Sequence, residues 1–298
     1  MDSKKNIKWF QDILNTPAIK IFHNAMYDVC WLRSAGIKIR GKIVDTMIAA
    51  SLIDENRMSY ALNTLAKHYV GIGKDEKVLQ EAAKSYSVNP KSEMYKLPAM
   101  YVGEYAERDA EATLKLWQRL NVELHSQELM DVFNLETKLF PCLVDMKFKG
   151  VKIDVEKARA FGKRLGETKT NIINYIERRT GIKIEMWAAS SIKALLDHQN
   201  IDDYKKTKAG LPQLPKDYLS SHKNKYLRLI AKARNFDKTQ NTFIEGLLEF
   251  VHDGRIHADI NQIRSYQGGT VTGRFSMSNP NLQQIPSRGF IGKKMRER

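Results

Sequence analysis

The sequence has little of what marks secreted, thiolate-metal and membrane proteins. Its two cysteines, Cys30 and Cys142, lie far apart and in no metal-like spacing, so neither a disulfide framework nor a thiolate zinc site is predicted. It lacks any run of about 18 apolar residues, the length that a membrane span needs, and no apolar core follows the lysines of its first ten residues. We therefore expect a reduced, cytoplasmic compartment and no membrane partner.

Acidic residues are outnumbered, and the imbalance is uneven along the chain. The 298 residues include 49 Lys plus Arg and 34 Asp plus Glu, a formal net charge of +15. Residues 1–130 hold 18 basic and 16 acidic residues, whereas the remainder holds 31 and 18, an excess of 13. A single basic run is as often a solvated helix face as a nucleic-acid contact. An excess of this size over the whole chain favours a nucleic-acid partner.

Short apolar runs alternate with helical patterns in the first third of the chain, which indicates an α/β arrangement. The segment Gly71–Pro98 contains two glycines and two prolines, and we expect it to be a loop. Helical periodicity resumes over Tyr101–Leu120. The elements expected before that loop are a strand over Ala18–Phe22, a helix over Tyr27–Ala35, extended chain over Ile37–Ile43 and a helix over Thr46–Leu52.

Long helices dominate the rest of the sequence. Apolar residues recur at helical spacing from Leu135 to Met146 before Gly150. A second helix is expected from a cap at Asp154 to Gly181, and a third, basic one over Lys223–Val251. The polar segment Asp202–Pro215 is predicted to be a mobile loop.

Two acidic constellations stand out in the first third. Asn24 and Asp28 follow an apolar strand at the start of a helix, where side chains often face a cleft. Tyr105 and Asp109 are four residues apart, on one face of a helix. Carboxylates are the groups that a pair of catalytic divalent metals needs, but Asp28 as a helix cap and Asp109 as an exposed helix acid remain open alternatives.

The segments HNAMYDVCWL and YVGEYAERDAEATLKL resemble the second and third motifs of the DEDD-type 3′-5′ exonucleases that precede family A DNA polymerases. VDTMIAASLIDENRMSYALNTLAKHY at Val44–Tyr69 is similar to the segment between those motifs, with Asp45 in a structural or supporting role. The resemblance implies an RNase H-like α/β domain in which Asp28 and Asp109 are catalytic and bind two Mg²⁺ or Mn²⁺ ions. It also implies that Tyr105 orients the attacking water and that Asn24 places the 3′ end of single-stranded DNA.

The first motif of those exonucleases, an Asp-x-Glu, lies several dozen residues before the Asn24 position, and only 23 residues precede Asn24 here. We therefore expect two of the four acids to be missing and the RNase H-like domain to be incomplete at its N-terminus. VKIDVE, with Asp154 and Glu156, imitates the motif but follows Asp109 and opens a helical pattern.

The second half resembles the polymerase region of the same family. LETKLFPCLVDMKFKGVKID at Leu135–Asp154 is similar to its opening helix, and GRIHADINQ followed by TGRFSMSNPNLQQIPSR at Thr272–Arg288 is similar to the run before its first catalytic palm motif. Long donors in that run suit minor-groove acceptors that all base pairs share. The residues expected to contact primer-template DNA are Arg274, Asn281 and Gln283, with Arg288 near the phosphates of the incoming nucleotide and Lys238 on the basic helix.

Together these features predict part of a bacteriophage-like or bacterial family A DNA polymerase that acts in DNA replication. We expect an exonuclease domain over 1–126, an entry helix and helical thumb over 127–253, and the start of an α+β palm over 254–298. Because the chain stops at IGKKMRER, before the palm acids of the family, we expect the isolated chain to lack both activities. The alternatives are a non-catalytic DNA-binding subunit completed by a second polypeptide, and a free-standing exonuclease of the RNase D kind. The latter leaves TGRFSMSNPNLQQIPSR unexplained.

Overall fold

The computed structural model describes residues 3–73, 76–264 and 269–296. The chain divides into two compact units, each of them discontinuous in sequence. Unit 1 comprises Met1–Lys149 and Ala258–Gln283, and unit 2 comprises Gly150–His257 and Gln284–Arg298. Each unit has its own buried core and is described separately.

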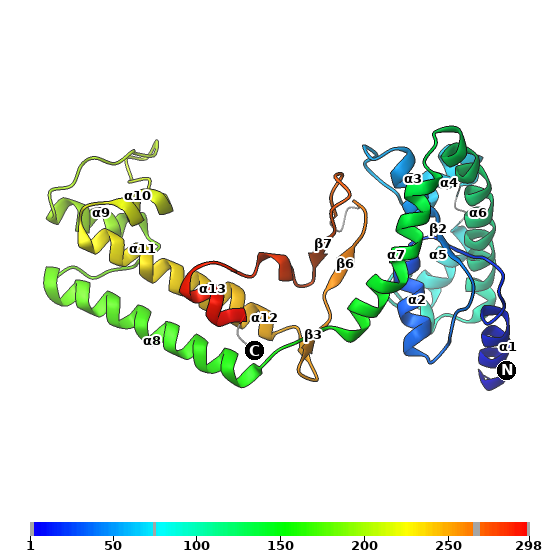
Figure 1. The fold of residues 1–298 in the computed structure, drawn as a ribbon, viewed down its shortest axis with the longest axis horizontal. Coiled ribbons are helices and arrows are strands. Elements are labelled where there is room, and N and C mark those ends of the chain that lie inside the picture. The colour runs from blue at the N-terminus through cyan, green and yellow to red at the C-terminus, as the bar shows by residue number, and fades with distance from the viewer. Residues whose placement is uncertain (1–2, 74–75, 265–268, 297–298) are drawn as a thin grey trace. The chain divides into compact units, whose positions relative to one another are not determined.

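Unit 1 is built on a β-α-β unit, as the alternating patterns predict. Strand β1 (Lys20–Phe22) pairs in parallel with β2 (Ile43–Asp45), with Phe22 opposite Asp45, and α2 (Ala25–Ser34) connects them (Figure 1). The predicted extended segment Ile37–Ile43 becomes a strand only at its last residue. Both strands end at the same edge of the sheet, where α2 and α3 (Thr46–Ile53) begin.

Helices pack against this sheet and against one another. They are α4 (Leu62–Val70), α6 (Ala99–Ser126) and α7 (Met130–Lys149), and α1 (Ser3–Leu14) precedes β1 in the chain. The core at their contacts contains fully buried Val44, Leu65, Leu116 and Phe133. Trp117 of α6 stacks on Phe133 of α7 with ring centroids 5.3 Å apart, so these two helices share one apolar seam.

The predicted loop Gly71–Pro98 is wrong in its middle part. Residues Lys77–Ser85 form helix α5, and a short 3-10 helix, η1, spans Met94–Lys96. Leu79, Ala82 and Ala83 are buried at helical spacing, together with Leu97, so a short amphipathic helix covers this side of α6. Flanking glycines and prolines conceal it because they occupy only its ends.

Unit 2 begins with a long helix whose limits match the prediction. Helix α8 (Val155–Thr180) starts where the Asp154 carboxylate accepts the Lys157 backbone N–H at 2.9 Å, and it ends at Gly181 with φ +71°. Helix α11 (Lys225–Lys238) packs along it, and α9 (Ala189–His198) and α10 (Lys216–Ser221) close the far end around a separate core (Figure 1). The fully buried residues of that core are Ile176, Ile192, Leu195, Leu196, Leu219, Leu227 and Ile230.

Two predictions for unit 2 need correction. The helix expected over Lys223–Val251 changes at Lys238 into a π-helical segment, η2 (Thr239–Glu245), and ends with α12 (Gly246–Leu248). Residues 202–215, predicted to be a loop without packed structure, form a hydrogen-bonded turn in which the Thr207 N–H donates to the Leu211 carbonyl at 2.8 Å and the Gln213 N–H donates to the Lys205 carbonyl at 2.7 Å. The polar composition of this segment does not predict these main-chain hydrogen bonds.

Short antiparallel strands occur in both units. In unit 2, β3 (Val151–Lys152), β5 (Arg255–Ile256) and β4 (Val251–His252) form a sheet in that order. In unit 1, β6 (Asp259–Asn261) pairs with β7 (Ser276–Ser278). The remaining elements are the 3-10 helix η3 (Leu282–Gln284) and helix α13 (Gly289–Arg296). Among the described residues no helix is both long and apolar enough to span a bilayer.

A carboxylate joins the two long helices of unit 2. Asp237 of α11 accepts hydrogen bonds from Lys169 Nζ of α8 at 2.9 Å and from the Trp187 indole at 2.8 Å, and its side chain is 13% exposed. Burial raises the pKa of Asp237, and the hydrogen bonds from Lys169, Trp187 and Asn241 more than offset it, so the pKa lies below its ordinary value. The ionised form is therefore the one that the fold stabilises.

We expect Asp237→Asn to lower the free energy of unfolding of unit 2 at neutral pH by about 2 kcal/mol. Because the folded pKa is below the unfolded value of about 3.9, this stabilisation is complete above that value and is lost as the pH falls through the folded pKa. The measurement is urea unfolding at pH 7 and at pH 3, followed by Trp187, the only tryptophan between residues 150 and 257. If Asp237→Asn lowered the free energy of unfolding equally at pH 7 and at pH 3, this prediction would be contradicted.

Candidate active site and nucleic-acid interface

Asp45 organises the edge of the sheet in unit 1. It is buried at the end of β2, and its carboxylate accepts the backbone N–H groups of Asn24 at 3.0 Å, Ala25 at 2.7 Å and Met47 at 2.8 Å. One side chain therefore satisfies the first N–H groups of both α2 and α3. Burial raises the pKa of Asp45, and the backbone hydrogen bonds oppose that shift. The structural role expected for Asp45 is confirmed.

Asn24 and Asp28 stand at the start of α2, next to this carboxylate. Asn24 precedes the helix in the left-handed region, with φ +64°, and its side chain is exposed. Asp28 lies one turn later and is half-buried. Burial, and then the neighbouring charge of Asp45, raise the pKa of Asp28. A cation bound beside Asp28 would reverse that effect, because an opposite charge favours the carboxylate.

Tyr105 and Asp109 are on α6, one turn apart and both partly buried. Tyr105 packs against the small core around Leu79 and Leu97, and α6 also contacts β1, the strand that leads to Asn24. The same domain thus carries both acidic constellations. The convergence of the Asp28 and Asp109 carboxylates on a metal pair stays a prediction.

The ligand chemistry suits a hard divalent cation, since Asp28 and Asp109 offer only oxygen donors. Two carboxylates do not complete a two-metal centre. Within the part of the chain that the structure describes, no group of three or more His, Cys, Asp and Glu side chains is placed to hold a metal ion. Asp28 and Asp109 are therefore the candidate metal ligands among the described residues.

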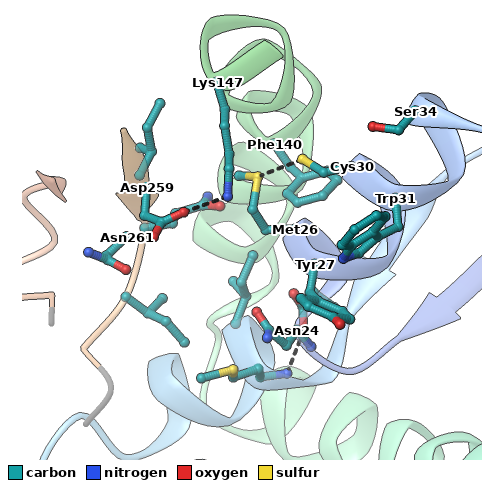
Figure 2. Close-up of a pocket in the computed structure, with 16 residues that line it drawn as sticks. Asn24, Met26, Tyr27, Cys30, Trp31, Ser34, Phe140, Lys147, Asp259 and Asn261 are labelled. Atoms are coloured by element: carbon teal, nitrogen blue, oxygen red, sulfur yellow. Dashed lines mark hydrogen bonds and ion pairs between the residues drawn. The ribbon is translucent and has the colours of Figure 1, made fainter. Parts of the chain in front are cut away.

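A cleft of about 550 Å³ lies in unit 1 beside α2 (Figure 2). One wall carries Tyr27 and Trp31 of α2 together with its N-cap Asn24, and another carries Asn261 of β6. Tyr27 and Trp31 form an edge-to-face pair with centroids 6.3 Å apart and are 62% and 65% exposed. The other lining residues are Met26, Cys30, Ser34, Asp45, Met47, Ile48, Phe140, Lys147, Asp259, Ile260, Gln262 and Ile263.

An ion pair fixes the β6 side of the cleft. Lys147 Nζ of α7 lies 2.6 Å from Asp259 Oδ1, and Asn279 Nδ2 donates to the other carboxylate oxygen at 3.0 Å. Burial raises the pKa of Asp259, but the hydrogen bonds from Lys147 and Asn279 outweigh it and the net shift is downward. Asn261 is held in turn by its Nδ2, which donates to Ser278 Oγ at 3.0 Å.

Sequence reasoning missed the aromatic and β6 walls of this cleft. Tyr27 and Trp31 are four residues apart on a helix and flank the Asp28 position, a signal that was available in the sequence. Asn261 follows Asn24 by more than two hundred residues, and no local pattern predicts that they line one cavity.

The predicted DNA contacts of the second half are exposed, and two of them have local partners. Gln283 Nε2 donates to the Phe275 carbonyl at 3.0 Å, and the Gln283 backbone N–H donates to Asn281 Oδ1 at 3.1 Å. Both residues therefore also hold their own loop in place. Arg274 in unit 1 is exposed, as are Lys238 and Arg288 in unit 2, and DNA contact by these five residues stays a prediction.

Arg228 on the basic helix α11 is more tightly engaged than its charge pattern suggests. Its guanidinium donates to the backbone carbonyls of His222 and Lys223, both at 2.7 Å. Arg234 likewise lies over the Trp187 ring, 5.1 Å from its centroid. Exposed Lys232 and Lys238 are the better candidates for phosphate contacts from this helix.

Known families match both parts of the chain. The family model described as DNA polymerase family A matches residues 155–298, and the one described as 3′-5′ exonuclease matches residues 1–125. A DNA-directed DNA polymerase of Pseudomonas phage M6 is 33% identical over 277 residues, covering 89% of this chain and 42% of that protein. DNA polymerase DpoZ of Acinetobacter phage SH-Ab 15497 is 32% identical, covering 94% and 49%.

Cellular polymerases match as well. DNA polymerase I of Geobacillus stearothermophilus is 30% identical, with 89% of this chain and 30% of that protein covered. The chain thus spans about half or less of the length of these relatives. A solved structure titled POL domain of Pol1 from M. smegmatis in complex with DNA primer-template and dNTP covers 99% of this chain and 47% of its own, with a TM-score of 0.70 and 23% identity, which shows a shared fold.

The two family models cover 1–125 and 155–298 without overlap, and the phage relatives align across both regions. Nothing in these comparisons supports a separate non-catalytic subunit or a second polypeptide. The chain therefore belongs to the family A DNA polymerases, with a 3′-5′ exonuclease region ahead of its polymerase region.

Proposed function

We propose that this chain serves a replicative DNA-directed DNA polymerase by binding the 3′ end of single-stranded DNA in its exonuclease region and primer-template duplex in its polymerase region. The exonuclease region is taken to be RNase H-like, in agreement with its parallel β-α-β unit. The domain limits 1–126, 127–253 and 254–298 remain predictions.

The cleft beside α2 is the observation that carries this proposal. It brings Asn24 and Tyr27, from the exonuclease-type segment around Asp28, into the same cavity as Asn261 from the polymerase-type segment. Exposed aromatic rings offer faces on which bases stack, and amides offer donors and acceptors for base edges. An unpaired strand has both features available, whereas the bases of a duplex are already stacked and paired.

In this proposal Asp28 and Asp109 hold divalent metal, which would activate water and stabilise the leaving oxygen of a phosphodiester. Tyr105, one turn from Asp109, orients the attacking water. Asn24 positions the strand, since its backbone is fixed by the buried Asp45 carboxylate and its side chain is exposed. The roles of these residues rest on the motif resemblance together with their placement in one domain.

We expect Asn24→Ala and Asn261→Ala each to weaken binding of a single-stranded oligonucleotide about fivefold or more, because each removes a polar contact in the cleft. Duplex binding should stay within twofold. The measurement is fluorescence anisotropy of a labelled oligonucleotide, single-stranded and annealed, with the 298-residue chain in Ca²⁺ or EDTA to prevent turnover.

Asn63→Ala is the matched control, an amide on α4 that lies outside the cleft lining. Equal losses for single-stranded and duplex DNA would show that the cleft does not distinguish them. If neither cleft variant differed from Asn63→Ala, the proposed single-strand site would be wrong.

A further inference from the structure

Three side chains recur at four-residue intervals along α6: Tyr101, Tyr105 and Asp109. Four-residue spacing places them on one helix face. A fourth side chain joins this row from another element, since Tyr86 at the end of α5 lies beside Tyr101 with ring centroids 6.1 Å apart and planes inclined by 58°. The row therefore runs from a proposed metal ligand to a pair of aromatic rings.

The two rings differ in burial, since Tyr101 packs on a small core and Tyr86 is half exposed. Leu79, Ala82 and Ala83 of α5 form the small core on which Tyr101 packs, so that ring is held in place. Tyr86 is 50% exposed, a large fraction for a ring that could have been buried against the same core. An aromatic pair in which one ring packs on a core and the other is half exposed can offer a face on which a base stacks.

The surrounding charge favours an anionic partner. Residues 77–101 contain four lysines, Lys77, Lys84, Lys91 and Lys96, against two acids, Glu81 and Glu93, and Lys96 Nζ is paired with Glu93 Oε1 at 2.5 Å. Lys84 lies on α5, two residues before Tyr86, and is exposed. Aromatic rings interleaved with lysines are the composition that binds unpaired nucleic acid, because every base has a π face and every nucleotide a phosphate.

We propose that Tyr86 and Tyr101 form a stacking platform for bases of the single strand whose 3′ end enters the exonuclease site. This rests on the function proposed above for Asp109 and Tyr105. Eight residues of α-helix separate Tyr101 from Asp109, a rise of about 12 Å. Stacked nucleotides of one strand are about 3.4 Å apart, so the platform serves bases within about four nucleotides of the scissile phosphate.

The test uses 2-aminopurine, whose fluorescence is quenched on stacking, placed in turn at each of the last four positions of a single-stranded oligonucleotide. With the 298-residue chain in EDTA, we expect quenching at one or two of these positions. The pair Tyr86→Ala and Tyr101→Leu should abolish that quenching and weaken binding about fivefold or more. Leucine retains apolar contact with the core beneath Tyr101, and circular dichroism reports whether the fold persists.

Two controls sharpen the result. Tyr86→Phe keeps the ring and should behave as the wild type, and Tyr175→Ala removes a partly exposed ring on α8 in unit 2 and should change nothing. If Asn24→Ala weakens binding but the Tyr86 and Tyr101 substitutions leave affinity and quenching unchanged, the platform is wrong while the proposed function stands. If single-stranded DNA does not bind at all, both are overturned.

Discussion

Asp45→Ala is expected to lower the free energy of unfolding of unit 1 by about 3 kcal/mol or more. Three backbone N–H groups, at Asn24, Ala25 and Met47, lose their shared acceptor at once, and each buried unsatisfied donor costs about 1–3 kcal/mol. The substitution also removes the N-terminal caps of both α2 and α3. Urea denaturation followed by circular dichroism and tryptophan fluorescence measures the loss.

Asp45→Asn should lower the free energy of unfolding by less than Asp45→Ala does. The asparagine amide keeps one acceptor oxygen but turns an NH₂ group toward the remaining donors. Asp12→Ala, an exposed acid on α1, should change stability by no more than about 0.5 kcal/mol. If the alanine variants at 45 and 12 were equally stable, the shared-cap interpretation of the α2–α3 edge would fail.

Lys232→Ala combined with Lys238→Ala is expected to flatten the salt dependence of duplex binding by about two units of slope. Each phosphate contact contributes about 0.9 to the slope of log affinity against log salt, and both lysines are exposed on the basic helix α11. Affinity at low salt should fall about tenfold or more, with little dependence on DNA sequence. A titration of a labelled primer-template duplex from 50 to 300 mM salt provides the slope.

Arg228 is unsuitable for this test, since its bonds to the His222 and Lys223 carbonyls mean that its removal would also loosen the start of α11. The matched control is Lys5→Ala combined with Lys67→Ala, which removes the same charge from exposed positions of unit 1. Should the control pair flatten the slope as much as the α11 pair, net charge rather than contact by this helix would explain the effect.

Local signals predicted the parts of the fold that local chemistry determines. Asp154 and Gly181 bound α8 because a cap and a left-handed C-terminus involve only neighbouring residues. Short-range patterns did not predict structure where a hydrogen-bond partner is distant in sequence or is a main-chain group. The turn around Thr207 is closed by main-chain bonds, and the capping of α2 by Asp45 joins residues twenty positions apart.

The site divides in the same way. Asn24, Asp28, Tyr105 and Asp109 are recognisable from motif spacing, but their roles come from the family resemblance and stay predictions. The cleft depends on α2 and β6 meeting in unit 1, which no helical or strand periodicity encodes. The Tyr86 and Tyr101 pair lies partly in a segment that glycine and proline content marks as loop, and only the buried face of α5 reveals it.

The small sheet β3-β5-β4 bears on how this architecture can vary among relatives. The chain leaves unit 1 after Lys149 and re-enters it at Ala258, and β3 pairs directly with β5, with Ile153 N–H bonded to the Gly254 carbonyl at 2.9 Å. The segment between β3 and β5 is thus closed by the pairing of these two strands. A change in the length of this segment therefore costs little closure entropy and leaves the paired strands β3 and β5 in register, so we expect its length to vary among relatives more readily than theirs.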